Sequence, residues 1–349
     1  MCKKILTYLV LFLSVLACER KPLYLRSDAA LNVNVEVSAE IRALWDESWE
    51  DSLKYEWDED KYGKLGYTLP EECYIVVFNN KEMVAEKQIK VGKRELIDID
   101  LNKTYDMLIY ARENFWLKTS YDDEKYFIEV PSQDTKADKD ETVDQPGEVF
   151  AANKNNLYIS DDLSEFEEVF EDGKLIYVYN IDEKLGPVSY IYVIQFIVIN
   201  DDHSERIEAK DIAGFTINGI SIKKNLLKNE PVYTPDKQIE AFDIKPGQER
   251  KDSLIFASRV TILDLLPDNP ETSWTSEIEY RCFASIDVNT YSYGEVKGTK
   301  DITDQLKKNP KGGVITVRIM NSELKQGGES GSGFGVDLGD WNEHEYDIT

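Results

Sequence analysis

Histidine is scarce in this chain, because His203 and His344 are the only two among 349 residues. Both stand in polar segments, "NDDHSER" and "WNEHEYD", far apart in the sequence. A catalytic triad or a zinc site commonly needs histidine beside a nucleophile or beside further ligands. Two scattered histidines therefore argue against a histidine-based catalytic or metal centre, and we expect no metal and no cofactor.

Cysteine is also rare, and no two of the four cysteines form a CxxC pair. This spacing excludes a thioredoxin-type redox motif and a zinc knuckle. Cys73 and Cys282 each stand within a strand-like apolar run, 209 residues apart in the sequence. A disulfide between them is possible in an exported protein, but we favour two buried free thiols.

Motifs that mark common enzyme active sites are missing. The sequence contains no P-loop, no GxSxG elbow, no HExxH and no Rossmann glycine pattern. The segment "DEDKYG" begins like a calcium loop, but its twelfth position is Leu69, where a bidentate Glu is required. Nothing in the spacing singles out a catalytic pair among the 67 acidic residues. We therefore expect a protein that is not an enzyme.

Basic residues are outnumbered, with 41 lysines and arginines against 67 acids and a formal net charge of -26. An acidic surface repels phosphate backbones, so this balance excludes nucleic acid as a partner. Hydrophobic residues nevertheless make up 42% of the chain and aromatic residues 11%, which is ample for packed cores. Global disorder is therefore excluded as well.

The chain lacks an apolar run of the roughly 20 residues that a membrane-spanning helix needs. Its most apolar run, 5–17, follows two lysines and ends at Cys18, which gives it the layout of a secretory signal. The end of this run, "VLAC", is typical of a bacterial lipobox, in which the cysteine sulfur carries diacylglycerol and the signal is cut before it. An ordinary signal peptide with a chance cysteine is the alternative. We favour a lipid anchor at Cys18, since several acyl chains on one residue hold a protein stably on a membrane.

The sequence pattern predicts strands along much of the remaining chain. Apolar and polar residues alternate in "LNVNVEV" (31–37), "ELIDIDL" (95–101) and "EIEYRCFASIDV" (277–288), as expected for half-buried strands. Many such short runs with turn residues between them indicate β-sandwiches. Further predicted strands cover 73–79, 104–111, 125–130, 175–180, 190–200, 214–222, 253–263 and 313–319.

One segment, 39–57, has apolar residues at helical spacing and predicts a helical insertion. A long loop is the alternative. The segment also contains most of an aromatic cluster, for which there are two interpretations. The rings could form a platform that stacks on a sugar or on a partner protein, or they could pack onto the first sandwich as core, which we favour. The cluster consists of Trp45, Trp49, Tyr55, Trp57 and Tyr62.

Composition divides the chain further. The segment 131–147 is polar and acidic and predicts a loop, while "KQGGESGSGFG" (325–335) is rich in glycine and serine and predicts flexibility. The expected organisation is an all-β chain with two tandem β-sandwich domains. Its parts are a signal peptide at 1–17, a lipid tether at 18–29, sandwich domains at 30–168 and 169–322, and a tail at 323–349.

Several segments together resemble the fimbrillin-like lipoproteins of Bacteroides-type bacteria. They are the lipobox cysteine followed by "ERKPL", the run "LNKTYDMLIYA", "DITDQL" (301–306) and the glycine-rich tail with "DW". The resemblance implies transthyretin-like sandwiches, lipidation at the outer membrane, and relatives that build or anchor surface fimbriae. In relatives that polymerise, cleavage after a basic residue removes the first strand and a donor strand replaces it. Here Arg26, just before "SDAALNVNVEV", is the possible processing site.

The sequence thus predicts a lipid-anchored cell-surface protein that serves as an anchor or accessory subunit of a fimbria. A strand that fills the gap left in a sandwich pairs by β-augmentation. A subunit that keeps its own strand at 31–37 would anchor or cap such an assembly, with fimbrial subunits as its possible partners. The alternative is a surface lipoprotein that binds a glycan through the aromatic cluster.

Overall fold

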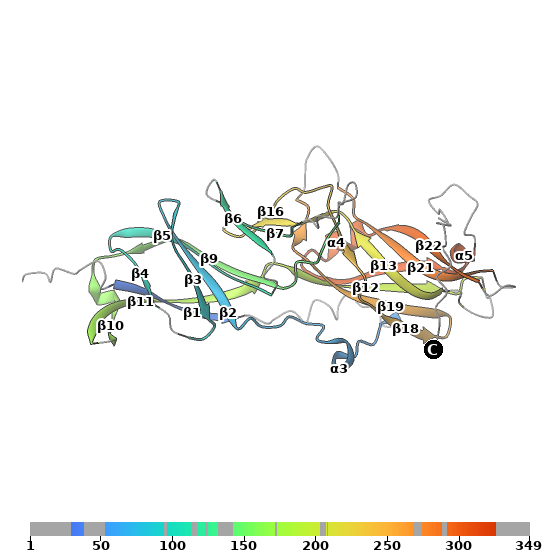
Figure 1. Cartoon of the computed structure of the whole chain (residues 1–349), viewed down its shortest axis with the longest axis horizontal. Coiled ribbons are helices and arrows are strands. Elements are labelled where there is room, and N and C mark those ends of the chain that lie inside the picture. Colours follow the sequence, from blue (N-terminus) through green and yellow to red (C-terminus); the bar gives the residue numbers. More distant parts are fainter. Residues whose placement is uncertain are drawn as a thin grey trace, which may run out of the picture.

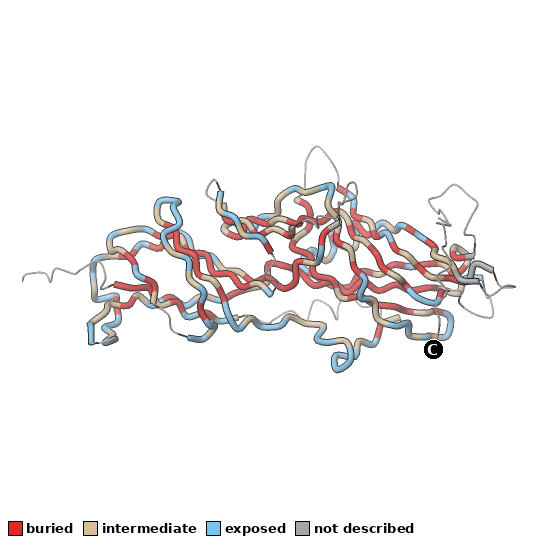
Figure 2. The backbone as a smooth tube through the Cα atoms, in the orientation of Figure 1, coloured by how far each residue is buried: buried red, intermediate tan, exposed pale blue. Residues whose placement is uncertain are grey.

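The computed structural model describes residues 29–37, 53–93, 96–113, 117–122, 125–131, 142–171, 173–202, 207, 209–267, 274–287 and 292–325. These residues form an elongated molecule built almost wholly of strands, as Figure 1 shows. The all-β fold predicted from the alternating sequence pattern is therefore confirmed. Buried residues follow the strands along the whole length of the molecule (Figure 2).

One half of the molecule, called here the first sandwich, has two four-stranded leaves. Among the described residues, the leaves pair with each other through their backbones at two positions of β9 and β11, Gly186 with Ala151 and Pro187 with Phe150. The inward side chains of both leaves form one apolar core. The first leaf runs in the order β10 (Glu167–Glu171), β11 (Lys174–Pro187), β1 (Ala29–Val37) and β4 (Leu96–Asp98). The second leaf runs in the order β3 (Glu82–Lys90), β2 (Glu72–Asn79), β5 (Lys103–Arg112) and β9 (Val149–Ile159).

The other half, the second sandwich, also has two sheets that face each other across a shared core. Phe196 of one sheet packs edge to face on Phe215 and Tyr280 of the other, with ring centroids 5.2 and 6.1 Å away. The first sheet runs in the order β18 (Ile244–Arg250), β19 (Ser253–Ile262), β12 (Tyr190–Ile199) and β23 (Gly313–Met320). The second runs in the order β22 (Ser292–Asp301), β21 (Glu277–Asp287), β13 (Ala209–Ile217), β17 (Gln238–Ala241) and β8 (Thr142–Val143).

Strand β12 is apolar on both faces, unlike the alternating strands around it. Ile194 and Phe196 point into the core of the second sandwich, whereas Val193 and Ile197 belong to a smaller apolar cluster on the opposite side of the sheet. A continuous apolar run is expected where both faces of a strand are covered. The outer face of this sheet must therefore have its own cover, and residues 53–65 supply it.

A smaller four-stranded sheet contains strands from both halves of the sequence. In it β7, from the first half of the sequence, pairs with β15, from the second half. It runs in the order β16 (Glu230–Pro231), β15 (Lys223–Asn225), β7 (Lys125–Glu129) and β6 (Lys118–Asp122). The remaining described elements are β14 (Ile220–Ser221), β20 (Asp264–Leu265), the helices α3 (Glu59–Tyr62), α4 (Thr303–Lys308) and α5 (Asn321–Lys325), and a 3-10 turn at Leu163–Glu165.

Two expectations differ from this arrangement. Most of the helix predicted at 39–57 lies outside the described residues. In its described end Leu53 has a 3-10 conformation, residues 54–58 form no helix, and the helix α3 begins only at Glu59. The segment crosses a sheet, and its backbone hydrogen-bonds to side chains there. The domain boundary predicted after residue 168 falls inside β10, whose neighbours belong to the first sandwich. We propose that the two sandwiches divide at the turn between β11 and β12.

Candidate functional site

The strand nearest the predicted lipid tether, β1, lies inside a sheet of the first sandwich. It pairs in parallel with β11 over nine residues, from Ala29 with Tyr177 to Val37 with Leu185. On its other side it pairs antiparallel with β4 over three residues. The space between β11 and β4, called here the β1 slot, is therefore filled by β1. The residues of β1 precede their partners in β11 by 148 positions in the sequence.

Alternating side chains fix β1 in its slot. Leu31 and Val33 have no exposed surface, and Val35 is only 3% exposed. They enter the core of the first sandwich together with Ile181 and Leu185 of β11. Burial of such side chains contributes about 1.5–3 kcal/mol each to folding. The first strand predicted from "LNVNVEV" is thus an integral part of the core.

The described part of the aromatic cluster lies on the second sandwich, and not on the first sandwich as expected from the sequence. Residues 53–68, called here the strap, run along the outer face of the sheet that contains β12 (Figure 1). Tyr55 is completely buried there; its backbone N–H donates to Gln195 Oε1 at 2.8 Å, and its hydroxyl donates to the carbonyl of Pro246 at 3.0 Å. Gln248 accepts from the N–H of Glu56 and donates to the carbonyl of Glu56, so its side-chain amide pairs with the strap as a neighbouring strand would.

The rings of the strap pack edge to face. Trp57 lies at 62° to Tyr55 and at 68° to Tyr62, and its indole N–H donates to the carbonyl of Gly63. The ammonium of Lys245 stands 5.7 Å from the Trp57 ring and 5.4 Å from the Tyr62 ring. A platform for a sugar needs exposed, coplanar rings, and the three described rings do not form one. Tyr55 is buried in the small apolar cluster on this sheet, and Trp57 and Tyr62 are partly buried against it, while Trp45 and Trp49 lie outside the described residues.

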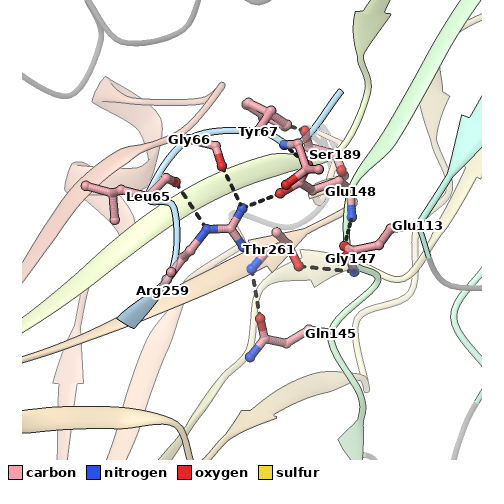
Figure 3. A network of polar contacts seen from close by, with 12 residues as sticks. Leu65, Gly66, Tyr67, Glu113, Gln145, Gly147, Glu148, Ser189, Arg259 and Thr261 are labelled. Carbon is pink, nitrogen blue, oxygen red and sulfur yellow. Dashed lines mark hydrogen bonds and ion pairs between the residues drawn. The ribbon is translucent and has the colours of Figure 1, made fainter. Parts of the chain in front are cut away.

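A buried ion pair fastens the strap where the two sandwiches meet (Figure 3). Arg259 of β19 donates from Nη2 to Oε1 of Glu148 at 2.5 Å, and its Nε donates to the carbonyl of Leu65 at 3.1 Å. The other carboxylate oxygen of Glu148 accepts from the N–H of Thr68 at 2.5 Å. Burial raises the pKa of Glu148 above its usual value, and the Thr68 N–H and the Arg259 guanidinium oppose that shift. The pair joins the strap, the start of β9 and β19 at one point.

Neighbouring polar groups complete this network. Tyr67 donates its hydroxyl hydrogen to the carbonyl of Ser189, and the Ser189 hydroxyl accepts from the N–H of Val149. Thr261 accepts from the N–H of Gly147, and its own N–H donates to Gln145 Oε1 (Figure 3). Each of these bonds links the connections between the sandwiches to each other or to β19. The junction is thus held by several buried hydrogen bonds, which favours a fixed orientation of the two sandwiches.

A second buried ion pair lies at the same junction. Lys224 has no exposed side-chain surface; its Nζ stands 2.7 Å from Oδ2 of Asp264 and donates to the carbonyl of Val188 at 3.0 Å. Burial lowers the pKa of Lys224, and Asp264 opposes that shift. The turn at residues 188–189 is therefore held by Lys224 at Val188 and by Tyr67 at Ser189.

The other predicted site residues lie elsewhere. Cys18 and Arg26 are outside the described residues, so lipidation and processing stay predictions. Cys73 and Cys282 are buried and free, in separate cores, as favoured from the sequence. Burial raises the pKa of the Cys73 thiol to about 11 and that of Cys282 to about 12.

One pocket among the described residues has a volume of about 430 Å³ and lies beside the start of β1, since Ile99 in its wall donates its N–H to the carbonyl of Ala29. Two of its charged groups, Lys103 and Asp100, already pair with each other at 2.7 Å. No group of three or more potential metal ligands occurs among the described residues. None of the described helices has the length and apolar character that crossing a membrane requires.

Sequence reasoning missed the polar residues that hold the strap and the junction. Gln195 stands in the most apolar strand of the chain, and Glu148 and Lys224 are charged residues with almost no exposed surface. A polar residue inside a continuous apolar run is the one signal that marks Gln195 beforehand. Glu148 and Lys224 carry no such signal, since each occurs in a locally mixed segment.

Comparisons with known proteins give structural likeness only. No family model matches the chain, and no curated protein matches its sequence. A candidate adhesin from Bacteroides ovatus superposes with a TM-score of 0.46 and 11% identity, covering 83% of this chain and 92% of that one. The fimbrial anchor protein Mfa2 from Porphyromonas gingivalis gives 0.43 and 9%, covering 84% and 90%.

A third similar structure is a candidate polysaccharide-binding protein from Bacteroides thetaiotaomicron. It gives a TM-score of 0.42 and 8% identity, covering 84% of this chain and 91% of that one. The structures that the chain resembles are therefore adhesin-like and fimbrial-anchor proteins, the class indicated by the sequence resemblance. At these identities the likeness concerns the path of the chain alone.

Proposed function

We propose that this chain is a non-enzymatic lipoprotein of the outer membrane, exposed at the cell surface and held there through Cys18. In this proposal it serves adhesion or surface assembly as an anchor or accessory subunit related to those of fimbriae. The lipid would be attached eleven residues before β1 begins, so the first sandwich would stand next to the membrane. The second sandwich would then face away from it.

The observation that carries this proposal is the position of β1. The slot between β11 and β4 is filled by the chain's own strand, and the inward side chains of that strand, Leu31, Val33 and Val35, are buried. A sandwich that lacks a strand exposes unpaired backbone groups and can bind an incoming strand. A chain whose own strand fills the slot exposes no such groups there. This arrangement suits a fixed end of an assembly better than a repeating unit.

The junction between the sandwiches supports an anchoring role. The connections near residues 65–68, 145–149 and 187–190 are among those that would transmit a pull on the second sandwich to the tether. The pairs Arg259–Glu148 and Lys224–Asp264 hold these connections together. Because both acids are paired with bases inside the junction, neither is positioned as a catalytic acid. This arrangement supports a mechanical role rather than a chemical one.

The mature N-terminus and mass of protein purified from native membranes test the proposal. A chain that begins at an acylated Cys18 and retains β1 is the expected result. The matched control is Cys18→Ser, which keeps the size of the side chain but cannot form the thioether, and should leave the protein uncut and unlipidated. A chain that begins at Ser27 would show that the tether is shed, which would overturn the anchor role.

A further inference from the structure

The outward side chains of β1 meet matching side chains of β11, pair by pair. At one end Ala30 stands beside Val178, and both are buried. Next, the Asn32 side-chain amide donates to Asn180 Oδ1 at 2.6 Å. The two further pairs have the same parallel register: Asn34 Nδ2 donates to Asp182 Oδ1 at 3.1 Å, and Glu36 stands beside Lys184. We call these four pairs the outward row.

The row extends to a third strand. Asn180 uses its own Nδ2 to donate to Glu167 Oε2 of β10 at 2.9 Å. Asn32, Asn180 and Glu167 thus form a chain of hydrogen bonds across three neighbouring strands. Within the described residues, the Oδ1 atom of Asn32 is shielded from solvent and has no partner. An asparagine kept at some cost in stability is a known way of fixing one register, as in coiled coils.

The inward side chains of β1 cannot fix the register alone. Leu31, Val33 and Val35 alternate with period two, so a slip of two residues returns the same kind of residue to the core. The outward row changes under such a slip. In one direction Glu36 would stand beside Asp182 and Asn32 beside the buried Val178. In the other direction Ala30 would stand beside Asn180, and Glu36 would reach Gly186 instead of a lysine.

We propose that the outward row is a specificity determinant of the β1 slot. The slot binds a strand whose four outward residues are, in order, a small apolar residue, two residues with amide side chains and an acidic residue, and it binds that strand in one register only. The segment that fits is therefore β1 itself or the same segment of a second copy of this chain. A strand with a basic residue at the last position would meet Lys184 and be rejected. The inference deepens the proposed function, since it names what keeps the slot filled by the chain's own strand.

The expected size of this selection follows from cross-strand pairs in general. Each matched pair shifts an equilibrium by up to about five-fold, and like charges placed side by side act in the opposite direction. Two side-chain hydrogen bonds and one complementary charge pair therefore distinguish the registers by up to about a hundred-fold. The apolar pair at the start of the row adds to this selection because a polar residue there would be buried.

A charge-swap cycle on the full chain tests the proposal. Glu36→Lys and Lys184→Glu each place like charges side by side, and the double variant restores a complementary pair with its order reversed. Both positions are exposed, so neither change disturbs the core. Hydrogen exchange of the β1 amides is the readout. Each single swap should raise the opening of β1 about five- to twenty-five-fold, and the double variant should return close to the wild-type value.

A matched control and a competition complete the test. Lys251→Glu, in an exposed turn of the second sandwich, makes the same change of charge far from the row and should leave exchange in β1 unchanged. An added peptide of residues 28–38 should enter the Lys184→Glu protein better when the peptide carries Glu36→Lys than when it has the natural sequence. Equal entry of both peptides, or single swaps that the double variant does not repair, would overturn the proposal.

This outcome is separate from that of the anchor role. The cycle measures purified chains and gives the same answer whether or not Cys18 carries lipid. A mature chain that begins at Ser27 would remove the anchor role and still contain all of β1, so the row could still select its strand. A failed cycle would leave the mature N-terminus as the test of the anchor role.

Discussion

Nη2 of Arg259 lies 2.5 Å from Oε1 of Glu148 at the point where the two sandwiches meet. The arginine belongs to β19 in the second sandwich, and the glutamate directly precedes β9 in the first. The glutamate side chain is 6% exposed and that of the arginine 21%. A charge removed from water to this degree depends on its partner, so this contact is sensitive to the loss of either side chain.

Arg259→Met should destabilise the protein markedly, because it leaves the buried Glu148 carboxylate without its counter-charge. Breaking a buried ion pair in this way costs about 3–5 kcal/mol in the free energy of unfolding. Chemical denaturation followed by tryptophan fluorescence measures the change. Arg250→Met is the control, since Arg250 pairs with an 81% exposed Glu56 and its loss should cost no more than about 1 kcal/mol. Equal losses in the two variants would contradict this account of the junction.

The loss caused by Arg259→Met should depend on pH. Burial raises the pKa of Glu148, so above the ordinary pKa of a glutamate, about 4.3, the folded state binds a proton more tightly than the unfolded state. In that window the free energy of unfolding falls as the pH rises. Without the guanidinium, which lowers this pKa, the fall should be larger and extend to higher pH. The difference in the free energy of unfolding between wild type and variant, measured by denaturation curves, should therefore increase from pH 4 to pH 8. A difference that does not change with pH would contradict this prediction.

Leu31→Ala should weaken the first sandwich, because Leu31 of β1 has no exposed surface and fills the core. Removing a buried leucine side chain costs about 2–5 kcal/mol. Denaturation gives the global loss, and hydrogen exchange should show it first in β1, β4 and β11. Asn34→Ala changes an exposed residue of the same strand and serves as the comparison, with a loss of about 1 kcal/mol. Similar effects of both changes would indicate that the buried side of β1 does not hold it in place.

Two substitutions of Tyr55 measure separately how much packing and hydrogen bonding of the strap contribute to stability. Tyr55→Phe removes the bond to the Pro246 carbonyl and should cost about 0.5–1.5 kcal/mol. Tyr55→Ala empties a fully buried aromatic site and should cost about 3–5 kcal/mol. The Trp57 ring stands 6.3 Å from that of Tyr55, so the second change should also shift tryptophan emission. A Tyr55→Ala protein as stable as Tyr55→Phe would show that the strap does not cover the sheet.

Cys73 and Cys282 should resist alkylation in the folded protein. Burial raises the pKa of Cys73 to about 11 and that of Cys282 to about 12, so almost no thiolate forms at pH 8. Iodoacetamide labelling followed by peptide mass spectrometry should find both thiols unmodified in buffer and both modified in urea. Rapid labelling of Cys73 in buffer would show that the core of the first sandwich opens readily.

The alternating strands could be predicted from the sequence because their pattern follows directly from which face is buried. β1 and β21 agree with their predictions, whereas β4 covers only 96–98 of the strand predicted at 95–101. Strand β3 was missed because it lies at a sheet edge, where charged residues shield the unpaired backbone. Its turn from β2 has positive φ angles at Asn80 and Lys81, and a lysine there gives no turn signal.

The strap and the junction could not be predicted, because both depend on contacts between residues far apart in the sequence. The apolar residues of 39–57 have helical spacing, but residues 54–58 form no helix, and Tyr55 binds a sheet whose Gln195 follows 140 residues later. Whether Glu148 meets a base depends on how two sandwiches are oriented, which local patterns do not encode. Of the aromatic cluster, the sequence could therefore indicate a preference for core packing, but not the surface on which it packs.

The parallel pairing of β1 with β11 also has a consequence for the order in which the protein forms. β1 leaves the ribosome well before its main partner, which follows 148 residues later. Until residue 185 has emerged, an apolar strand and later an open sheet edge stay unpaired, and both favour aggregation. Contacts of such long range also slow folding, because a large loop must close before they form. Strand β1 is thus enclosed only after β11 has formed, and until then it must be kept apart from other unpaired strands.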